Sequence, residues 1–109
     1  FLYDDPIDST WAKDINISFW IKGYIHDLMG RIVVAVDAFD EDGNATSLAW
    51  GRVGQFVNAI DGEDGRVYIP VTLPEHTVKL RIAMGDPNLP PKPVAYNNLL
   101  IYPQKYANK

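Results

Sequence analysis

The side chains that could perform catalysis in this 109-residue chain are few and scattered. Its two histidines, His26 and His76, lie far apart in the sequence, each in a segment that we expect to be a turn. The chain has neither the Gly-x-Ser-x-Gly motif of a serine hydrolase nor the His-Glu-x-x-His motif of a zinc protease. The acidic pairs also fall in segments with turn chemistry, where a solvated carboxylate is the ordinary interpretation. We therefore expect a protein that is not an enzyme.

One acidic segment has the spacing of a calcium loop over its first half. Asp40, Asp42 and Asn44 form an Asp-x-Asp-x-Asn pattern. An EF-hand loop also needs glycine at its sixth position and glutamate at its twelfth. Here the glycine, Gly43, is at the fourth position, and Gly51 stands where the glutamate belongs. We expect an ordinary hairpin turn and no bound metal. Because the chain has no cysteine, a disulfide or a thiolate metal site is excluded.

Aromatic side chains with polar neighbours are better candidates for a binding site. Trp20 lies in an extended segment with one aliphatic face, and it shares the other face with Asn16, Ser18 and Lys22. An indole ring in such surroundings can stack on the apolar face of a sugar ring while its neighbours bind the hydroxyl groups. The competing interpretation is that Trp20 packs beneath a covering loop.

Other residues are predicted to face outward from their strands as Trp20 does, and they are Asp37, Tyr68, Lys79 and Arg81. If the strands lie side by side, these side chains form one face with two aromatic rings, a carboxylate and two cations. The alternative is a solvated face, on which an ion pair between Asp37 and Arg81 would contribute less than ~1 kcal/mol. A third group lies at strand ends and in a glycine-rich segment, where it would line a rim: Tyr24, Trp50 and Gln55.

The composition narrows the class of partner. Acidic residues outnumber basic ones by 14 to 10, giving a net charge of −4. Nucleic acid binding needs clustered Lys and Arg, so a nucleic acid partner is not expected. No apolar run approaches the ~18 residues of a membrane span, so no membrane partner is expected either. The chain begins at Phe1, and we expect residues 1–109 to be a single domain of a larger protein.

Period-two alternation of apolar residues predicts the elements that position these side chains. The strongest signal runs from Gly65 to Met84, where two alternations flank a turn, and we expect a pair of neighbouring strands there. Further strands are predicted over 14–25, 31–40, 46–50 and 94–102, and residues 1–13 form an irregular entry or a short edge strand. Residues 51–65 are predicted to form a long loop with room for a short helix over 55–60. Six or seven strands predict an all-β, antiparallel β-sandwich.

Four segments resemble strands of the jelly-roll carbohydrate-binding modules, which have a galactose-binding-like fold. They are 17–23 (ISFWIKG), 66–75 (RVYIPVTLPE), 78–83 (VKLRIA) and 96–103 (YNNLLIYP). Such modules are appended to glycoside hydrolases, and similar ones are inserted in tail and adsorption proteins of bacteriophages. The resemblance implies a β-sandwich of jelly-roll type that binds cell-surface or wall polysaccharide without catalysis. Its setting would be a larger extracellular or virion-associated protein.

The sequence differs from these modules at a position that commonly binds calcium in the family. Where the closing strand of these modules commonly carries an acidic residue that helps to hold calcium, this chain has Asn97 or Asn98. An amide oxygen is a weaker calcium ligand than a carboxylate, so we assign no cofactor.

Two other classes of function fit the same residues. In a structural or assembly module, the outward aromatic side chains would contact another domain or subunit, because protein interfaces are also rich in Trp, Tyr and Arg. An immunoglobulin-like domain with a protein partner is the other class, although the chain lacks the Cys-Trp-Cys arrangement of antibody domains.

Overall fold

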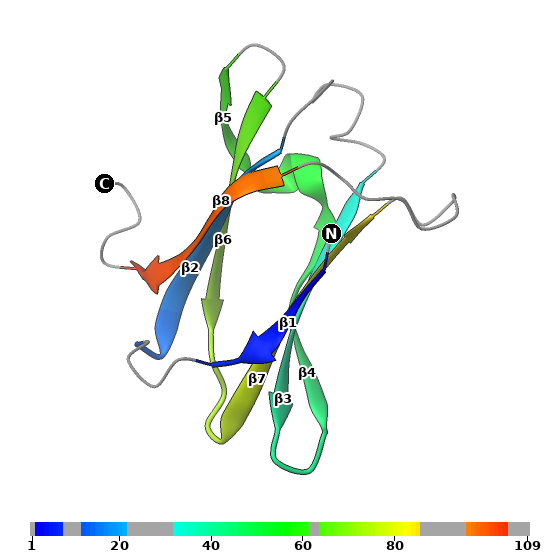
Figure 1. Cartoon of the computed structure of the whole chain (residues 1–109), viewed down its shortest axis with the longest axis vertical. Coiled ribbons are helices and arrows are strands. Elements are labelled where there is room, and N and C mark those ends of the chain that lie inside the picture. Colours follow the sequence, from blue (N-terminus) through cyan, green and yellow to red (C-terminus); the bar gives the residue numbers. More distant parts are fainter. Residues whose placement is uncertain (1, 8–11, 22–31, 62–63, 86–95, 105–109) are drawn as a thin grey trace.

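The computed structural model describes residues 2–7, 12–21, 32–61, 64–85 and 96–104. These residues form eight strands in two antiparallel sheets that pack against each other (Figure 1). The strands are β1 (Leu2–Pro6), β2 (Asp14–Ile21), β3 (Val33–Asp40), β4 (Ala45–Arg52), β5 (Val57–Asp61), β6 (Asp64–Thr72), β7 (Thr77–Gly85) and β8 (Tyr96–Pro103). A single 3₁₀ turn, η1 (Val53–Gln55), follows β4. The predicted all-β sandwich is confirmed.

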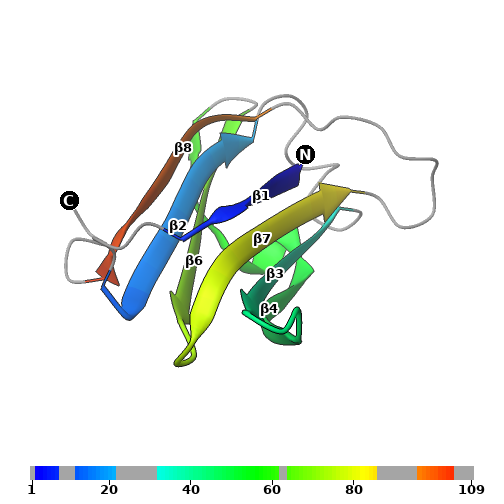
Figure 2. The ribbon, with the colours of Figure 1, turned by 60° about the horizontal axis from the view of Figure 1, so that its bottom comes forward.

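Each sheet has four strands and is named here after one of its two central strands. The β3 sheet has the order β1-β7-β3-β4, and the β2 sheet has the order β5-β6-β2-β8. Figure 2 shows the two sheets as separate layers. The neighbours β2-β6-β5 and β7-β3-β4 follow the order of strands B-E-D and F-C-C′ in an immunoglobulin-type sandwich, but β1 and β8 lie in the opposite sheets from strands A and G. This strand order does not confirm the jelly-roll arrangement.

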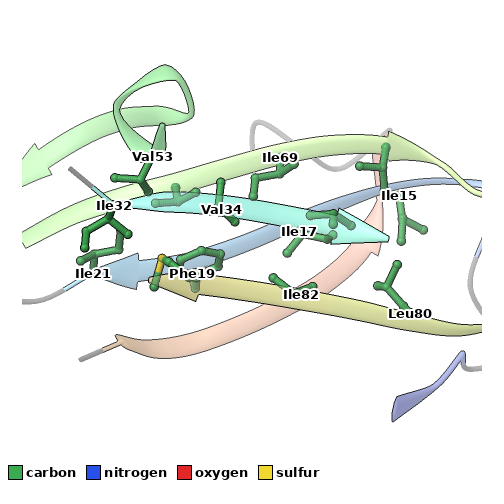
Figure 3. Close-up of a cluster of buried hydrophobic side chains, with 14 of the residues drawn as sticks. Ile15, Ile17, Phe19, Ile21, Ile32, Val34, Val53, Ile69, Leu80 and Ile82 are labelled. Carbon is green, nitrogen blue, oxygen red and sulfur yellow. The ribbon is translucent and has the colours of Figure 1, made fainter. Parts of the chain in front are cut away.

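The core lies between the sheets and follows from the alternation in the sequence. On β2, Ile15, Ile17 and Phe19 are fully buried, and their partners across the sandwich include Leu80 and Ile82 of β7 (Figure 3). Burying a side chain of this size contributes roughly 1.5–3 kcal/mol relative to leaving it exposed. The inward residues of both sheets therefore fix which face of each strand points to solvent.

The segment from Gly65 to Met84 does not form the predicted pair of neighbouring strands. β6 belongs to the β2 sheet and β7 to the β3 sheet, so the turn between them carries the chain across the sandwich. In this turn the Thr77 hydroxyl donates to the Pro74 carbonyl at 2.7 Å, and His76 has a positive φ of 68°. Both strands show the same alternation because both face the same core, one from each side. Two strands of a β-hairpin in one sheet would show the same alternation, so the sequence pattern does not distinguish the two arrangements.

The predicted loop over residues 51–65 is also wrong. It contains η1 and β5, and β5 pairs with β6 along the edge of the β2 sheet. No helix forms over 55–60, although Phe56 and Val57 pack against the core as expected. At the N-terminus, the short edge strand is the alternative that the structure confirms, as β1 pairs with β7. Nowhere in the described ranges does a helix have the length and apolar character needed to cross a membrane.

The acidic segment after β3 is the hairpin turn that the sequence predicts. The Asp40 carboxylate accepts the backbone N–H groups of Asp42 and Asn44, each at 2.9 Å. Donation by the Asn44 backbone is the main reason that the pKa of the Asp40 carboxyl lies below its ordinary value. Gly43 has a φ of 81°, which glycine adopts without steric cost. Asp40 therefore closes the turn between β3 and β4.

Candidate functional site

The five residues that the sequence predicts to share one face are divided between the two outer faces of the sandwich. Trp20 and Tyr68 belong to the β2 sheet, whereas Asp37, Lys79 and Arg81 belong to the β3 sheet. The prediction of one continuous face is therefore wrong. The alternation correctly placed each residue opposite the core, but a sandwich has two solvent faces that point in opposite directions.

On the outer face of the β3 sheet, the most prominent side chain is Trp50 of β4, which is 70% exposed. Its cross-strand partner is Ala35 of β3, and the next residue in the same row is Ala83 of β7. Both are alanines, so the side chains beside the indole are short and project little from the sheet. We call Trp50 and these two alanines the Trp50 strip. A flat ring that is exposed above a low apolar surface is suited to stacking on a sugar or on another protein.

The row next to the Trp50 strip is charged. Asp4 of β1, Arg81 of β7 and Asp37 of β3 lie opposite one another in register. Arg81 is exposed and has an acidic residue on the neighbouring strand at each side. These side chains can offer both donors and acceptors to the hydroxyl groups of a ligand that lies on the strip.

Beyond this row, Lys79 has two partners on the same face. Its Nζ lies 3.0 Å from Asp4 Oδ1 and 4.5 Å from the centroid of the Phe39 ring. Both contacts use the ammonium group, so Lys79 is less available to a ligand than Arg81. An exposed ion pair of this kind is typically worth less than ~1 kcal/mol.

Trp50 and Gln55, the two described members of the predicted rim group, do not lie on the same face. Gln55 is exposed, and its carboxamide lies against Gly51, where an added methyl group would overlap with it. Gly51 is buried and follows Trp50 directly, so the two residues face opposite sides of β4. Gln55 consequently lies on the inner side of this edge and not on the face that carries Trp50. Tyr24 lies outside the described residues.

On the outer face of the β2 sheet, two of the predicted residues surround a residue that the prediction omitted. Arg66 of β6 is the cross-strand partner of Trp20. Its Cζ lies 5.6 Å from the centroid of the Trp20 ring and 5.5 Å from that of Tyr68. Both distances are within cation–π range. We call Trp20, Arg66 and Tyr68 the Arg66 cluster. The signal for Arg66 was present in the sequence, because alternation places residues 66 and 68 on the same face.

The same face buries polar groups. Asn16 is 2% exposed, and its Nδ2 donates to the Tyr102 hydroxyl of β8 at 2.7 Å. Ser18 is fully buried and lies between Tyr68 of β6 and Leu100 of β8 in the register. The large residues on both sides account for this burial. Within the described part of the chain, the Ser18 hydroxyl has no hydrogen-bond partner, and neither has the buried Nε of Arg66.

Both outer faces carry side chains of kinds that can contact a ligand. Among the described residues, no group of three or more His, Cys, Asp or Glu side chains is placed to hold a metal ion. Exposed aromatic rings, amides, hydroxyls and cations recognise ligands by stacking and hydrogen bonding.

Comparisons with models of known protein families, with curated proteins and with solved structures found no match. The structure itself defines the class of protein as an all-β sandwich of two four-stranded antiparallel sheets. The resemblance to carbohydrate-binding modules is therefore supported only by the four sequence segments.

Proposed function

We propose that this domain binds carbohydrate without catalysis, and that its main site is the Trp50 strip on the outer face of the β3 sheet. The domain would attach a larger extracellular or virion-associated protein to cell-surface or wall polysaccharide. The observation that carries the proposal is the 70% exposure of Trp50. A large aromatic ring that is exposed beside a flat apolar surface can stack on the apolar face of a ligand.

The surroundings of Trp50 favour a sugar as the ligand. A pyranose stacked on the indole would extend over Ala35, whose short side chain leaves room for it. Asp37 is next to Ala35 on the same face of β3, and Arg81 is the cross-strand partner of Asp37. These two residues would accept from and donate to the sugar hydroxyls. A single open site of this kind has an affinity on the order of micromolar to millimolar, so attachment would depend on several copies.

The second candidate is an assembly module, and the position of Trp50 at an edge favours it. β4 is an edge strand of the β3 sheet, and edge strands have unpaired backbone groups that can pair with another chain. A partner domain that docked there would cover the indole as a sugar would. The order of the central strands also matches that of immunoglobulin-type sandwiches, many of which recognise proteins.

The test is a titration against a panel of neutral wall and cell-surface polysaccharides, with the domain displayed in multiple copies. We expect the wild type to bind at least one member, and Trp50→Ala to lower the affinity by about tenfold or more through lost stacking. Trp20→Ala is the matched control, because it removes an indole from the opposite face. Circular dichroism checks that each variant is folded.

Each outcome has a distinct meaning. Loss of binding in a folded Trp20→Ala, with Trp50→Ala unaffected, would move the site to the β2 sheet. No binding by the folded, multivalent wild type would contradict carbohydrate binding and support the assembly module.

A further inference from the structure

We infer that the Arg66 cluster is a second ligand site, on the face opposite the Trp50 strip, and that it takes an acidic saccharide such as a uronic acid. This inference does not depend on the Trp50 site, because the two sites lie on different sheets. Either site can fail its test without the other.

The first argument is the charge of Arg66. Among the described residues, no acidic side chain forms an ion pair with its guanidinium. Its contacts are the two aromatic rings, at 5.6 Å and 5.5 Å from Cζ. On the other face, Lys79 has a carboxylate within 3.0 Å. A partly exposed cation with no acidic partner among the described residues, in a chain with a net charge of −4, is suited to an external anion.

The second argument is the geometry that the rings impose. Contact with both Trp20 and Tyr68 restricts the movement of the guanidinium, so less conformational entropy is lost when it binds a ligand. The planar fork of arginine matches a carboxylate through two parallel hydrogen bonds. The flanking rings can pack against the apolar face of the sugar that carries this carboxylate.

The third argument is the set of polar atoms that lack partners. The Ser18 hydroxyl and the Arg66 Nε are buried and have no hydrogen-bond partner among the described residues. Buried polar groups are normally paired, and an exception calls for an explanation such as an absent ligand or water. Leu100, the cross-strand neighbour of Ser18, is 47% exposed, so its side chain can move aside. A uronic acid brings hydroxyls and a carboxylate on one small ring, whereas an acidic peptide side chain brings only the carboxylate.

The test compares oligogalacturonate with its methyl ester, which has the same sugar ring without the charge. We expect the wild type to bind the acid about tenfold or more tightly than the ester in low-salt buffer, where charge interactions are least screened. Arg66→Gln should abolish this preference. Lys79→Gln, which removes a cation of the opposite face that already has a carboxylate partner, should leave it unchanged.

Two further variants separate a ligand site from a structural role. Ser18→Ala should weaken binding of the acid by about threefold to tenfold, yet raise the urea midpoint of the free domain, because it removes an unpaired buried hydroxyl. Arg66→Lys keeps the positive charge without the planar fork, and it should retain only part of the preference for the acid.

The inference is overturned if the acid and the ester bind the wild type equally, or if Arg66→Gln retains the preference while folded. A poly-glutamate peptide is the remaining probe. If it binds in an Arg66-dependent manner and oligogalacturonate does not, the cluster is a protein-docking site and the saccharide assignment is wrong.

Discussion

The two outer faces of this sandwich differ in how far their aromatic side chains are exposed and in how their cations are paired. On the β3 sheet, Trp50 extends into solvent and Lys79 is paired with Asp4 at 3.0 Å. On the β2 sheet, Trp20 is half-buried against Arg66, and the neighbouring Ser18 has no exposed surface at all. The first face therefore has an exposed ring and a paired lysine. The second has half-buried rings and an arginine that forms no ion pair within the described part of the chain.

This difference shows that the same residue types can form different surfaces depending on what lies across the strands. Trp50 is next to alanines, and its side chain is 70% exposed. Trp20 is next to an arginine whose long side chain reaches over it. A neutral ligand fits the first arrangement, and an anionic ligand fits the second.

The largest expected effect comes from the core that both faces share. Phe19 is fully buried in it, and Phe19→Ala should lower the free energy of unfolding by about 3–5 kcal/mol through lost burial and a residual cavity. Urea denaturation followed by circular dichroism measures this change. Because one core supports both sheets, ligand binding at both faces should be lost in a single transition. Loss of one face at lower urea than the other would show that the sheets unfold separately.

A smaller effect should distinguish the two tryptophans. Trp20→Ala should cost about 2 kcal/mol of stability, because it removes a half-buried ring and one cation–π contact. Trp50→Ala should change stability by less than about 0.5 kcal/mol, as expected for an exposed side chain. The urea midpoints of the two variants give the comparison directly. Equal losses would contradict the contrast between an exposed and an enclosed indole.

The smallest effect concerns the ion pair on the β3 sheet. Asp4→Asn removes the partner of Lys79, and we expect a loss of less than about 1 kcal/mol that shrinks further as salt is added. Asp5→Asn is the control, since this adjacent exposed acid has no ion pair among the described residues. A loss in Asp4→Asn that persists at high salt would mean that the pair is shielded from solvent and that this face is less open than the structure indicates.

Much of the fold could be predicted from the sequence because alternation is a local signal. The inward residues of β2, such as Ile17 and Phe19, were assigned correctly, as was the turn closed by Asp40. β5 was missed because it is short and its segment contains several glycines, which are typical of loops. Alternation places Arg66 on the same face as Tyr68, but it does not show that Trp20 of another strand lies beside Arg66, and so the cluster was missed.

What the sequence by itself determined is the inside and the outside of each strand, since neighbouring side chains in a strand must point to opposite faces. Only the tertiary structure decided on which of the two outer faces each outward residue lies. β6 and β7 carry the same pattern on either side of a short turn, yet they lie in different sheets. Sheet membership depends on pairing between residues far apart in the chain, such as Ser18 with Leu100. A pattern of period two contains no information about such partners. It could not show that Trp20 and Tyr68 would lie on a different face from Asp37, Lys79 and Arg81.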